Sequence, residues 1–464
     1  MVKENDTIAA ICSGLTNSGI SIIRVSGEDA LKVVVKIAFA KREDFDLINT
    51  KTYTAHLCKI VDPKDGTLID EGLVLYMKAP KSYTGEDVVE LQLHGGVFVA
   101  NKVLNLLLKY GCRLAEPGEY TKRAFLNGKI DMAMAEAVMN VIQADNDRAL
   151  NISIRQLDGE LSDKIRSLRE RIIQENAYLE YALDDPEHVS LDGFKEKLLS
   201  IVDDILNEIK CLIDSYNEGR IVNEGVRTVI VGKPNAGKSS LLNVLLKEER
   251  AIVTDVAGTT RDTLEEKAII GGIPLNIVDT AGIRDTDDIV ESIGVDKAKS
   301  EIDKSDLIIY VVDGSVKLSE EDREIAEFIK DKNIIVILNK CDLDLQVTFD
   351  DIKMLFDKDI SIIESSMKDN EGIDDFVNVL KDMFFKGEID TNHDIIIANE
   401  RQKDALIRSF DSLTNVKDSI NADVSEDFYT IDLLEAYEAL GDVIGESYSD
   451  DLLDKVFSDF CVGK

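Results

Sequence analysis

Gly232-Lys-Pro-Asn-Ala-Gly-Lys-Ser239 is a complete phosphate-binding loop, and it decides the fold class of the segment around it. The apolar run Val229-Ile-Val231 precedes the loop and a helical run begins at Ser240, which is the strand–loop–helix setting that the motif requires. Its glycines let successive backbone N–H groups turn toward phosphate oxygens, and the N-terminus of the following helix adds positive potential. We therefore predict a doubly wound, mostly parallel P-loop domain, with Lys238 on the β- and γ-phosphates and Ser239 on Mg²⁺.

Further motifs follow in the order of a guanine-nucleotide site. Asp279-Thr-Ala-Gly282 ends an apolar strand, where its carboxylate can support the Mg²⁺ shell and its glycine N–H can follow the γ-phosphate. Asn339-Lys-Cys-Asp342 ends another strand, and the Asp342 carboxylate can accept both N1–H and N2–H of guanine, which adenine does not offer. Ser365-Ser-Met367 stands where a Ser-Ala-Lys or Ser-Ala-Leu guanine loop is usual, and it departs from that loop at two positions. The ordered set predicts GTP binding.

Length and composition limit what surrounds this G domain. At 464 residues the chain is long enough for about three domains, each with its own core. Its 54 basic and 90 acidic residues give a net charge of −36, which argues against a broad nucleic-acid-coating surface but leaves room for a local basic patch. Six cysteines without paired spacing are typical of a reducing compartment. Because we find no signal-peptide pattern and no long apolar run, we expect a cytoplasmic protein that does not enter a membrane.

Residues 1–125 alternate strand and helix patterns, which predicts a small α+β domain. The expected strands are 7–11, 19–25, 71–77 and 88–93, and the expected helices are 30–38 and 97–109.

From about residue 131 the pattern changes to long helices. One apolar face repeats at steps of three, four and seven, formed by Leu157, Leu161, Ile165, Leu168, Ile172, Leu179 and Leu183. Asp184-Asp-Pro186 ends this helix, and a second helix from Phe194 is expected to stop at Asn217-Glu-Gly219. Further helices are expected at 398–420, 429–445 and 449–459.

Helices before and after the G domain can bury their apolar faces on one another, so we expect the G domain to be inserted into a single helical bundle. The expected segments are an N-terminal domain at 1–125, the first helical part at 126–220, the G domain at 221–386 and the second helical part at 387–464.

Several longer stretches outside the G motifs carry a family resemblance. They are Asp6-Thr-Ile-Ala-Ala10, Ser21-Ile-Ile-Arg-Val-Ser-Gly27, Tyr83-Thr-Gly-Glu-Asp-Val-Val-Glu90, His94-Gly-Gly96, Pro117-Gly-Glu-Tyr-Thr-Lys-Arg-Ala-Phe-Leu-Asn-Gly-Lys129 and Phe460-Cys-Val-Gly-Lys464. The last two are far more specific than the G motifs. With them the chain resembles, over its whole length, the bacterial and organellar MnmE (TrmE) family of tRNA-modifying GTPases. One departure is Arg401-Gln402, where the family has Arg-His.

The resemblance implies a function that the G motifs alone do not. Family members act with the flavoprotein MnmG, as a homodimer within a heterotetramer, to install an aminomethyl or carboxymethylaminomethyl group at C5 of the wobble uridine of certain tRNAs. The N-terminal domain is similar to folate-binding one-carbon enzymes and is expected to hold 5,10-methylenetetrahydrofolate or a related folate. By motif match, the folate contacts are Arg24, Glu90, Lys129 and Lys464. From the residues alone, the same groups could be ordinary surface charges.

The expected GTPase mechanism is set by what the sequence lacks. After Gly282, GTPases such as Ras carry a glutamine that orients the attacking water, and here the position is Ile283. The family resemblance implies that K⁺ supplies positive charge and is bound by Asn235 and the 254–259 segment. It also implies that Glu291 orients the attacking water. By sequence alone, Glu291 could be a solvated residue at the start of a helix. The K⁺ ligands are expected to be Asn235, Thr254, Val256 and Thr259, and the Mg²⁺ ligands Ser239 and Thr260.

Two other side chains have open interpretations. Cys461, close to the cation Lys464, is either a nucleophilic thiol with a lowered pKa or a small buried hydrophobe beside Phe460. His94 precedes two glycines at a strand end, where a structural role in the turn is a better interpretation than acid–base chemistry.

The full set of residues expected to bind nucleotide is Asn235, Ala236, Gly237, Lys238, Ser239, Ser240, Thr254, Asp255, Val256, Ala257, Gly258, Thr259, Thr260, Asp279, Thr280, Ala281, Gly282, Asn339, Lys340 and Asp342. A ribosome-assembly GTPase that binds rRNA is the alternative from another class. Such proteins share the G motifs but normally add a basic RNA-binding domain, so the acidic composition and the terminal pentapeptide favour the tRNA-modifying family.

Overall fold

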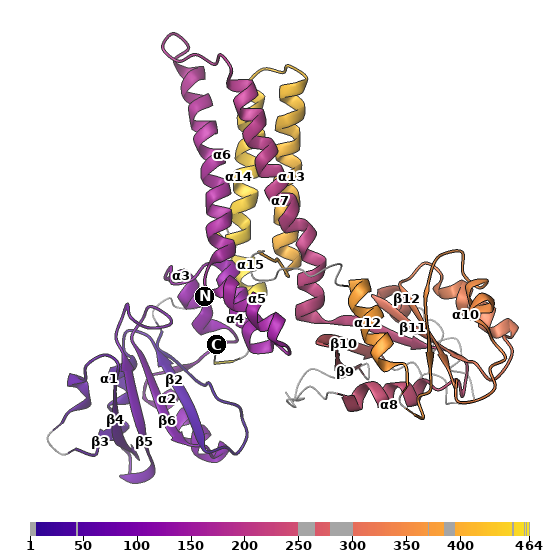
Figure 1. Cartoon of the computed structure of the whole chain (residues 1–464). Helices are drawn as coiled ribbons and strands as arrows, with labels where there is room; N and C mark the ends of the chain where they lie inside the picture. The colour runs from indigo at the N-terminus through magenta and orange to yellow at the C-terminus, as the bar shows by residue number, and fades with distance from the viewer. Residues whose placement is uncertain are drawn as a thin grey trace. The chain divides into compact units, whose positions relative to one another are not determined.

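The computed structural model describes residues 6–42, 45–248, 265–278, 300–369, 371–384, 395–447, 450–458, 460 and 462–463 (Figure 1). The chain divides into two compact units, one made of residues 1–142, 154–205 and 408–464 and the other of 143–153 and 206–407. None of the helices in the described ranges is long and apolar enough to cross a membrane.

A seven-stranded sheet organises the N-terminal part of the first unit. Its strand order is β3-β4-β5-β6-β2-β1-β7. The strands are β1 (Ile8–Ile11), β2 (Ile20–Ser26), β3 (Ala38–Ala40), β4 (Thr54–Asp62), β5 (Thr67–Met77), β6 (Val88–His94) and β7 (Arg113–Leu114). Ile23 and Val25 on β2 are buried in one core with side chains of α1 (Ala30–Val34) and α2 (Val97–Tyr110). Because side chains alternate along a strand, Arg24 lies on the opposite face of the sheet from this core.

The structure corrects two expectations in this region. The predicted helix at 30–38 ends at Val34, where three successive valines restrict side-chain rotation, and Ala38–Ala40 instead pairs with β4 as strand β3. The sequence does not predict strand β4 (Thr54–Asp62), because polar and apolar residues do not alternate cleanly along it.

A smaller core joins the end of the N-terminal part to the C-terminal segment. The helices involved are α3 (Glu119–Leu126), α4 (Met132–Gln143) and α15 (Asp450–Ser458). Phe125, Met132, Phe457 and Phe460 are buried together there. Gly118 precedes α3 with φ of 64°, and a Cβ at this position would come within 2.6 Å of the Phe457 carbonyl oxygen. Only glycine satisfies both the backbone conformation and this close approach.

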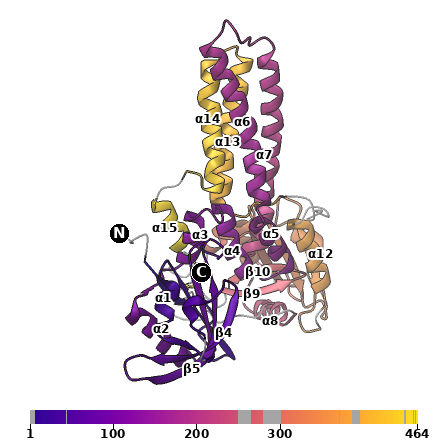
Figure 2. The ribbon, with the colours of Figure 1, turned by 90° about the vertical axis from the view of Figure 1, so that its left-hand side faces the viewer.

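Long helices form the rest of the first unit. In Figures 1 and 2, α6 (Glu160–Asp184), α7 (Phe194–Glu224), α13 (Glu400–Asn421) and α14 (Asp427–Ile444) run side by side as a bundle. The predicted apolar face is buried at Leu161, Ile165, Leu168, Ile172 and Leu179. Leu157 belongs instead to the preceding helix α5 (Asp147–Leu157), since Gly159 adopts φ of 92° and separates the two helices.

Helix α7 does not stop at Gly219 as the sequence predicts, and continues to Glu224. A Cβ on Gly219 would lie 2.1 Å from the Ile397 carbonyl oxygen, and the Ile397 N–H donates to the Ser215 hydroxyl at 3.2 Å. The glycine therefore serves close packing inside the helix rather than helix termination.

The G domain has a six-stranded sheet of order β13-β12-β11-β8-β10-β9, parallel except for β9. Its strands are β8 (Val226–Val231), β9 (Glu265–Ile270), β10 (Ile273–Val278), β11 (Leu307–Asp313), β12 (Ile334–Asn339) and β13 (Ser361–Ser365). One face packs on α8 (Lys238–Glu248) and α12 (Ile373–Phe384), and the other on α10 (Glu320–Ile329) and α11 (Phe349–Lys353). The doubly wound P-loop domain, inserted in sequence between α7 and α13, is confirmed.

Candidate functional site

The phosphate-binding loop connects β8 to α8 and has a tightly constrained backbone. Gly232 and Gly237 have φ of 149° and 109°, and Asn235 has φ of 64°. A Cβ would lie 2.3 Å from the Val311 carbonyl oxygen at Gly232, and 2.0 Å from Nδ2 of Asn339 at Gly237. Residues of the neighbouring strands therefore contact the loop closely at both glycines, and a larger residue at either position would displace the loop.

Lys238 lies within this loop. Its Nζ donates to the backbone carbonyls of Gly232, at 2.8 Å, and Lys233, at 2.9 Å. Ser239 and Ser240 are exposed in the first turn of α8, at the helix end that favours anions. These contacts hold the lysine amine among backbone dipoles where phosphate oxygens are expected to lie.

The guanine motif is joined directly to the phosphate-binding loop. Asn339, at the end of β12, is 3% exposed; its Nδ2 donates to the Ala236 carbonyl at 2.8 Å and its Oδ1 accepts from the Met367 N–H at 3.2 Å. Lys340 has φ of 68°, and its Nζ forms an ion pair with Asp313 at 2.5 Å. The structure thus brings the predicted phosphate and base contacts into one site.

The guanine loop lies one residue later than the sequence prediction placed it. Ser365 is the last residue of β13, and its hydroxyl donates to the Glu371 carbonyl at 2.9 Å. Ser366 Oγ, by contrast, lies 3.4 Å from Oδ1 of Asp342, and Lys368 Nζ lies 3.8 Å from Oδ2. Ser366-Met-Lys368 is therefore the Ser-Ala-Lys equivalent, and it departs from the usual loop only at its middle residue. Lys368 itself was the signal that could have fixed this register.

Other predicted residues lie outside the described part of the chain. These are Thr254, Asp255, Val256, Ala257, Gly258, Thr259, Thr260, Asp279, Thr280, Ala281, Gly282, Ile283, Glu291, Cys461 and Lys464.

A second group of predicted residues meets on the N-terminal sheet. Arg24 and Glu90 are register partners on β2 and β6, and their side chains form an ion pair with Nη2–Oε1 and Nε–Oε1 distances of 2.9 and 3.0 Å. The guanidinium carbon of Arg24 is 5.7 Å from the ring centre of Tyr83 and 5.6 Å from that of Tyr120. Both side chains of the pair are mostly buried, which makes a purely solvating role for these charges a poor explanation.

Lys129 and the end of the chain approach this sheet from other elements. Lys129 is exposed and its Nζ donates to the Pro80 carbonyl at 3.2 Å. Gly463 packs so closely on β1 that a Cβ there would lie 2.7 Å from the Ile11 carbonyl oxygen and 3.1 Å from Cα of Cys12. The C-terminal segment is therefore docked next to the strand that pairs with β2.

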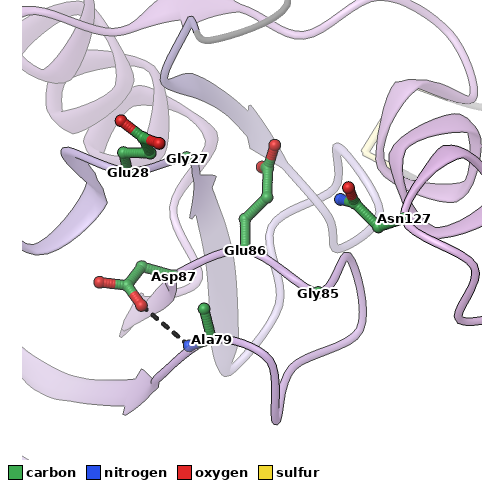
Figure 3. Close-up of a pocket in the computed structure, with 7 residues that line it drawn as sticks. All are labelled: Gly27, Glu28, Ala79, Gly85, Glu86, Asp87 and Asn127. Atoms are coloured by element: carbon green, nitrogen blue, oxygen red, sulfur yellow. Dashed lines mark hydrogen bonds between the residues drawn. The ribbon is translucent and has the colours of Figure 1, made fainter.

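A polar pocket of about 410 Å³ lies nearby (Figure 3). It is lined by Gly27, Glu28, Ala79, Gly85, Glu86, Asp87 and Asn127. The Glu86 carboxylate accepts from Arg123 and Ser26, and Asp87 accepts from the Ala79 N–H and the Tyr76 hydroxyl. Burial, together with this bond to Asp87, raises the pKa of Tyr76 to about 12. Both carboxylates therefore accept hydrogen bonds from neighbouring elements, and the described ranges contain no cluster of His, Cys, Asp or Glu suited to a metal ion.

His94 makes a structural contact at the end of β6. Its Nδ1 lies 2.6 Å from Oδ1 of Asp70, and its backbone N–H donates to the other carboxylate oxygen at 2.9 Å. Gln402, which replaces the family's His, is buried in α13.

A phosphate-binding loop after β8, bonded to an Asn-Lys-Cys-Asp motif after β12, defines a P-loop GTPase domain. Residues 7–129 match the family model described as the GTP-binding protein TrmE N-terminus, and residues 132–461 match the model of the MnmE helical domain.

Proteins of closely similar length extend this match. Each is described as a tRNA modification GTPase MnmE. The one from Lachnoclostridium phytofermentans is 50% identical over 461 residues, covering 99% of this chain and 100% of the relative. Those from Finegoldia magna and Clostridioides difficile are 46% and 47% identical, covering 99% of this chain and 100% and 99% of the relatives. The chain belongs to the MnmE family of tRNA modification GTPases, and it is itself a GTPase.

Proposed function

We propose that this GTPase acts with the flavoprotein MnmG to modify C5 of the wobble uridine of certain tRNAs to the carboxymethylaminomethyl or aminomethyl form, using a one-carbon unit of tetrahydrofolate. The observation that carries this proposal is the extent of the family match: relatives described as tRNA modification GTPases cover 99% of this chain, including the regions outside the G domain. A shared G domain alone would not support it.

In the G domain, GTP is held at both ends by the described residues. Lys238 and the N-terminus of α8 bind the β- and γ-phosphates, Ser239 ligates Mg²⁺, and Asp342 accepts the guanine N–H pair. Mg²⁺ bound there would supply positive charge opposite the phosphates. Asn235, exposed in a left-handed conformation of the loop, provides a side-chain oxygen for K⁺. Thr254, Val256, Thr259, Thr260 and Glu291 complete the proposed metal and water contacts from outside the described ranges.

In the N-terminal domain, the paired Arg24 and Glu90 bind folate, with Lys129 and Lys464 meeting its carboxylates. Support for this role comes from the mostly buried Arg24–Glu90 pair, whose guanidinium lies near the rings of Tyr83 and Tyr120, and from the docking of Gly463 next to β1. An acidic side chain can accept from a pterin N–H pair, and an aromatic ring can stack on the pterin. Cys461, two positions before Gly463, is a candidate nucleophile in the same reaction.

The protein acts as a homodimer that forms a heterotetramer with MnmG. Residues 1–125 are proposed as the folate-binding domain, 126–220 and 387–464 as the helical domain, and 221–386 as the G domain.

The test is mass spectrometry of tRNA nucleosides from a strain that lacks this protein. We expect the C5 substituents of wobble uridine to disappear and to return with the wild-type gene. A Lys238→Ala variant should fail to restore them, whereas Lys330→Met, which changes a partly exposed lysine that pairs with Glu327, should succeed. If the deletion strain contains as much C5-modified wobble uridine as the wild type, the proposal is overturned.

A further inference from the structure

Lys233, the second residue of the phosphate-binding loop, is held by a buried carboxylate behind the loop. Its Nζ donates to Oδ2 of Asp322 at 2.6 Å and to the Ser319 hydroxyl at 3.2 Å. Asp322 is 1% exposed, although it carries a charge in the first turn of α10. Buried charges require a compensating partner, and Lys233 is the cation that supplies it.

Both oxygens of the Asp322 carboxylate accept hydrogen bonds. Oδ2 also accepts from the N–H and hydroxyl of Ser319, at 2.7 and 2.9 Å, which forms a capping box at the start of α10. Oδ1 lies 3.2 Å from the Tyr310 hydroxyl, which donates to it from strand β11. Burial alone would raise the pKa of Asp322, but the bonds from Lys233 and Ser319 outweigh burial and lower it. The carboxylate is thus a fixed anchor point between β11 and α10.

The anchor acts on a loop that is already fixed at its other end. Asn339 binds the Ala236 carbonyl from β12, while Lys233 is bound by Asp322. Between these two attachments lies Asn235, the loop residue with φ of 64°. Asparagine tolerates this left-handed conformation better than most non-glycine residues, and the two attachments fix the backbone on either side of it.

We propose that Lys233 is a positioning residue for GTP hydrolysis, which holds the 233–236 backbone against Asp322 so that its N–H groups and Asn235 face the β- and γ-phosphates. The proposed role of Lys233 is to position the backbone of the phosphate-binding loop, and it does not determine which monovalent cation binds. Only the orientation of Asn235 toward K⁺ rests on the proposed function. The alternative is that the ion pair between Lys233 and Asp322 only stabilises the start of α10.

The test compares Lys233→Met, Lys233→Arg and Asp322→Asn with the control Lys330→Met in the full-length protein. We expect Lys233→Met to lower kcat for GTP at least about 10-fold while KM changes less, because the loop contacts strengthen in the transition state. Lys233→Arg should recover most of the rate, since arginine keeps the charge and the donors. The Lys233→Met/Asp322→Asn double variant should lose no more than the worse single variant, as residues that act as one unit are not additive.

Thermal unfolding of each variant separates positioning from stability. A role confined to α10 predicts a lower melting temperature with normal kcat and KM in the folded protein, and this result would overturn the proposal. Full activity of Lys233→Met would overturn it as well. Equal wild-type rates in K⁺ and Na⁺ would count against the proposed K⁺ site alone, because the comparison of Lys233 variants is made within one salt.

Discussion

Arg24 on β2 and Glu90 on β6 lie directly opposite one another in the sheet register and form an ion pair 2.9 Å long, with only 18% and 14% of their side chains exposed. Two opposite charges in this setting hold each other in place until a ligand competes for them. In the proposed folate site Glu90 would accept hydrogen bonds from the ligand and Arg24 would donate them, beside the rings of Tyr83 and Tyr120.

The folate assignment can be checked by calorimetry with 5-formyltetrahydrofolate. Lys129→Ala and Glu90→Gln should each weaken binding at least about 10-fold, since a lost hydrogen bond to a charged group costs about 1.5–3 kcal/mol. Lys32→Ala, which removes an exposed lysine paired with Asp29, should bind like the wild type. Normal binding by a protein lacking residues 1–125 would place the folate site elsewhere.

Asp342→Asn should change the base preference of the G domain. The variant replaces one of the two carboxylate oxygens that accept from guanine N1–H and N2–H with an NH₂ donor, so its affinity for GTP should fall on the order of 100-fold. It should gain affinity for xanthosine triphosphate, whose C2 carbonyl can accept from the new amide. Competition titrations with a fluorescent nucleotide measure both changes. An unaltered ranking of the two nucleotides would show that Asp342 does not contact the base.

Potassium should stimulate hydrolysis and sodium should not. Asn235→Ala is expected to keep GTP affinity nearly intact and to lower the K⁺-stimulated rate on the order of 10²–10³-fold, the cost of one oriented charge-stabilising contact. Glu291→Ala should slow turnover without preventing association of two G domains. Turnover is measured in the two salts at equal ionic strength, and association by light scattering with GDP and aluminium fluoride. Equal rates in both salts would leave Asn235 as an ordinary loop residue.

Gly118 and Gly128 form a matched pair for stability measurements. Both have positive φ, 64° and 65°, but a Cβ meets the Phe457 carbonyl at 2.6 Å only at Gly118 and meets nothing within 4 Å at Gly128. Gly128→Ala should cost about 1 kcal/mol from backbone strain alone. Gly118→Ala should cost about 2–4 kcal/mol, because the C-terminal helix must also move. Chemical unfolding followed by circular dichroism tests this difference, which similar losses in both variants would contradict.

Acid should weaken the N-terminal part through Glu119. Burial would raise the pKa of this carboxyl, but bonds from Arg113, the Glu116 N–H and Arg123 outweigh burial and lower the pKa below its usual value of 4.5. A lowered folded-state pKa gives stability that is present above about pH 5 and is lost as the pH falls through the folded pKa. Glu119→Gln should therefore be less stable than wild type at pH 7, by about 1–3 kcal/mol, and the gap should narrow toward pH 3.

The exposed Glu28 gives the control for this prediction. Glu28→Gln should unfold like the wild type at both pH values. A gap between Glu119→Gln and wild type that stays constant with pH would show that the lost interaction does not depend on the carboxylate charge.

Sequence patterns predicted most of this architecture where local and tertiary preferences agree. The phosphate-binding loop has only one common structural setting, and the apolar face from Leu161 to Leu179 has only one period that fits it. The errors arise where a distant segment decides. Gly219 remains helical because Ile397 packs on it, and the 30–38 helix ends early because Ala38–Ala40 pairs with β4. Neither partner can be identified from the local sequence.

The same reason limits prediction of the site. Motif spacing places Lys238 and Asp342 without knowledge of the fold, since each follows a strand whose carboxyl end faces the ligand. The bond between Lys233 and Asp322 crosses from one strand-loop unit to another, and only the arrangement of β8, β11 and α10 brings the two residues together. The register of the guanine loop differs from this case, because Lys368 in the sequence indicates it and the contact between Ser366 and Asp342 supports it.

The core around Gly118 has a consequence for biosynthesis. Its phenylalanines come from two places in the chain, with Phe125 synthesised early and Phe457 and Phe460 much later. A growing chain therefore leaves the ribosome with this apolar surface of its first domain uncovered while the helical and G-domain segments are still being made. Such exposed surface invites aggregation and chaperone binding. The N-terminal domain completes its packing only after the C-terminal segment with Phe457 and Phe460 has been synthesised and has bound to it. Translation pauses or truncations far downstream therefore affect the folding of a domain that was synthesised much earlier.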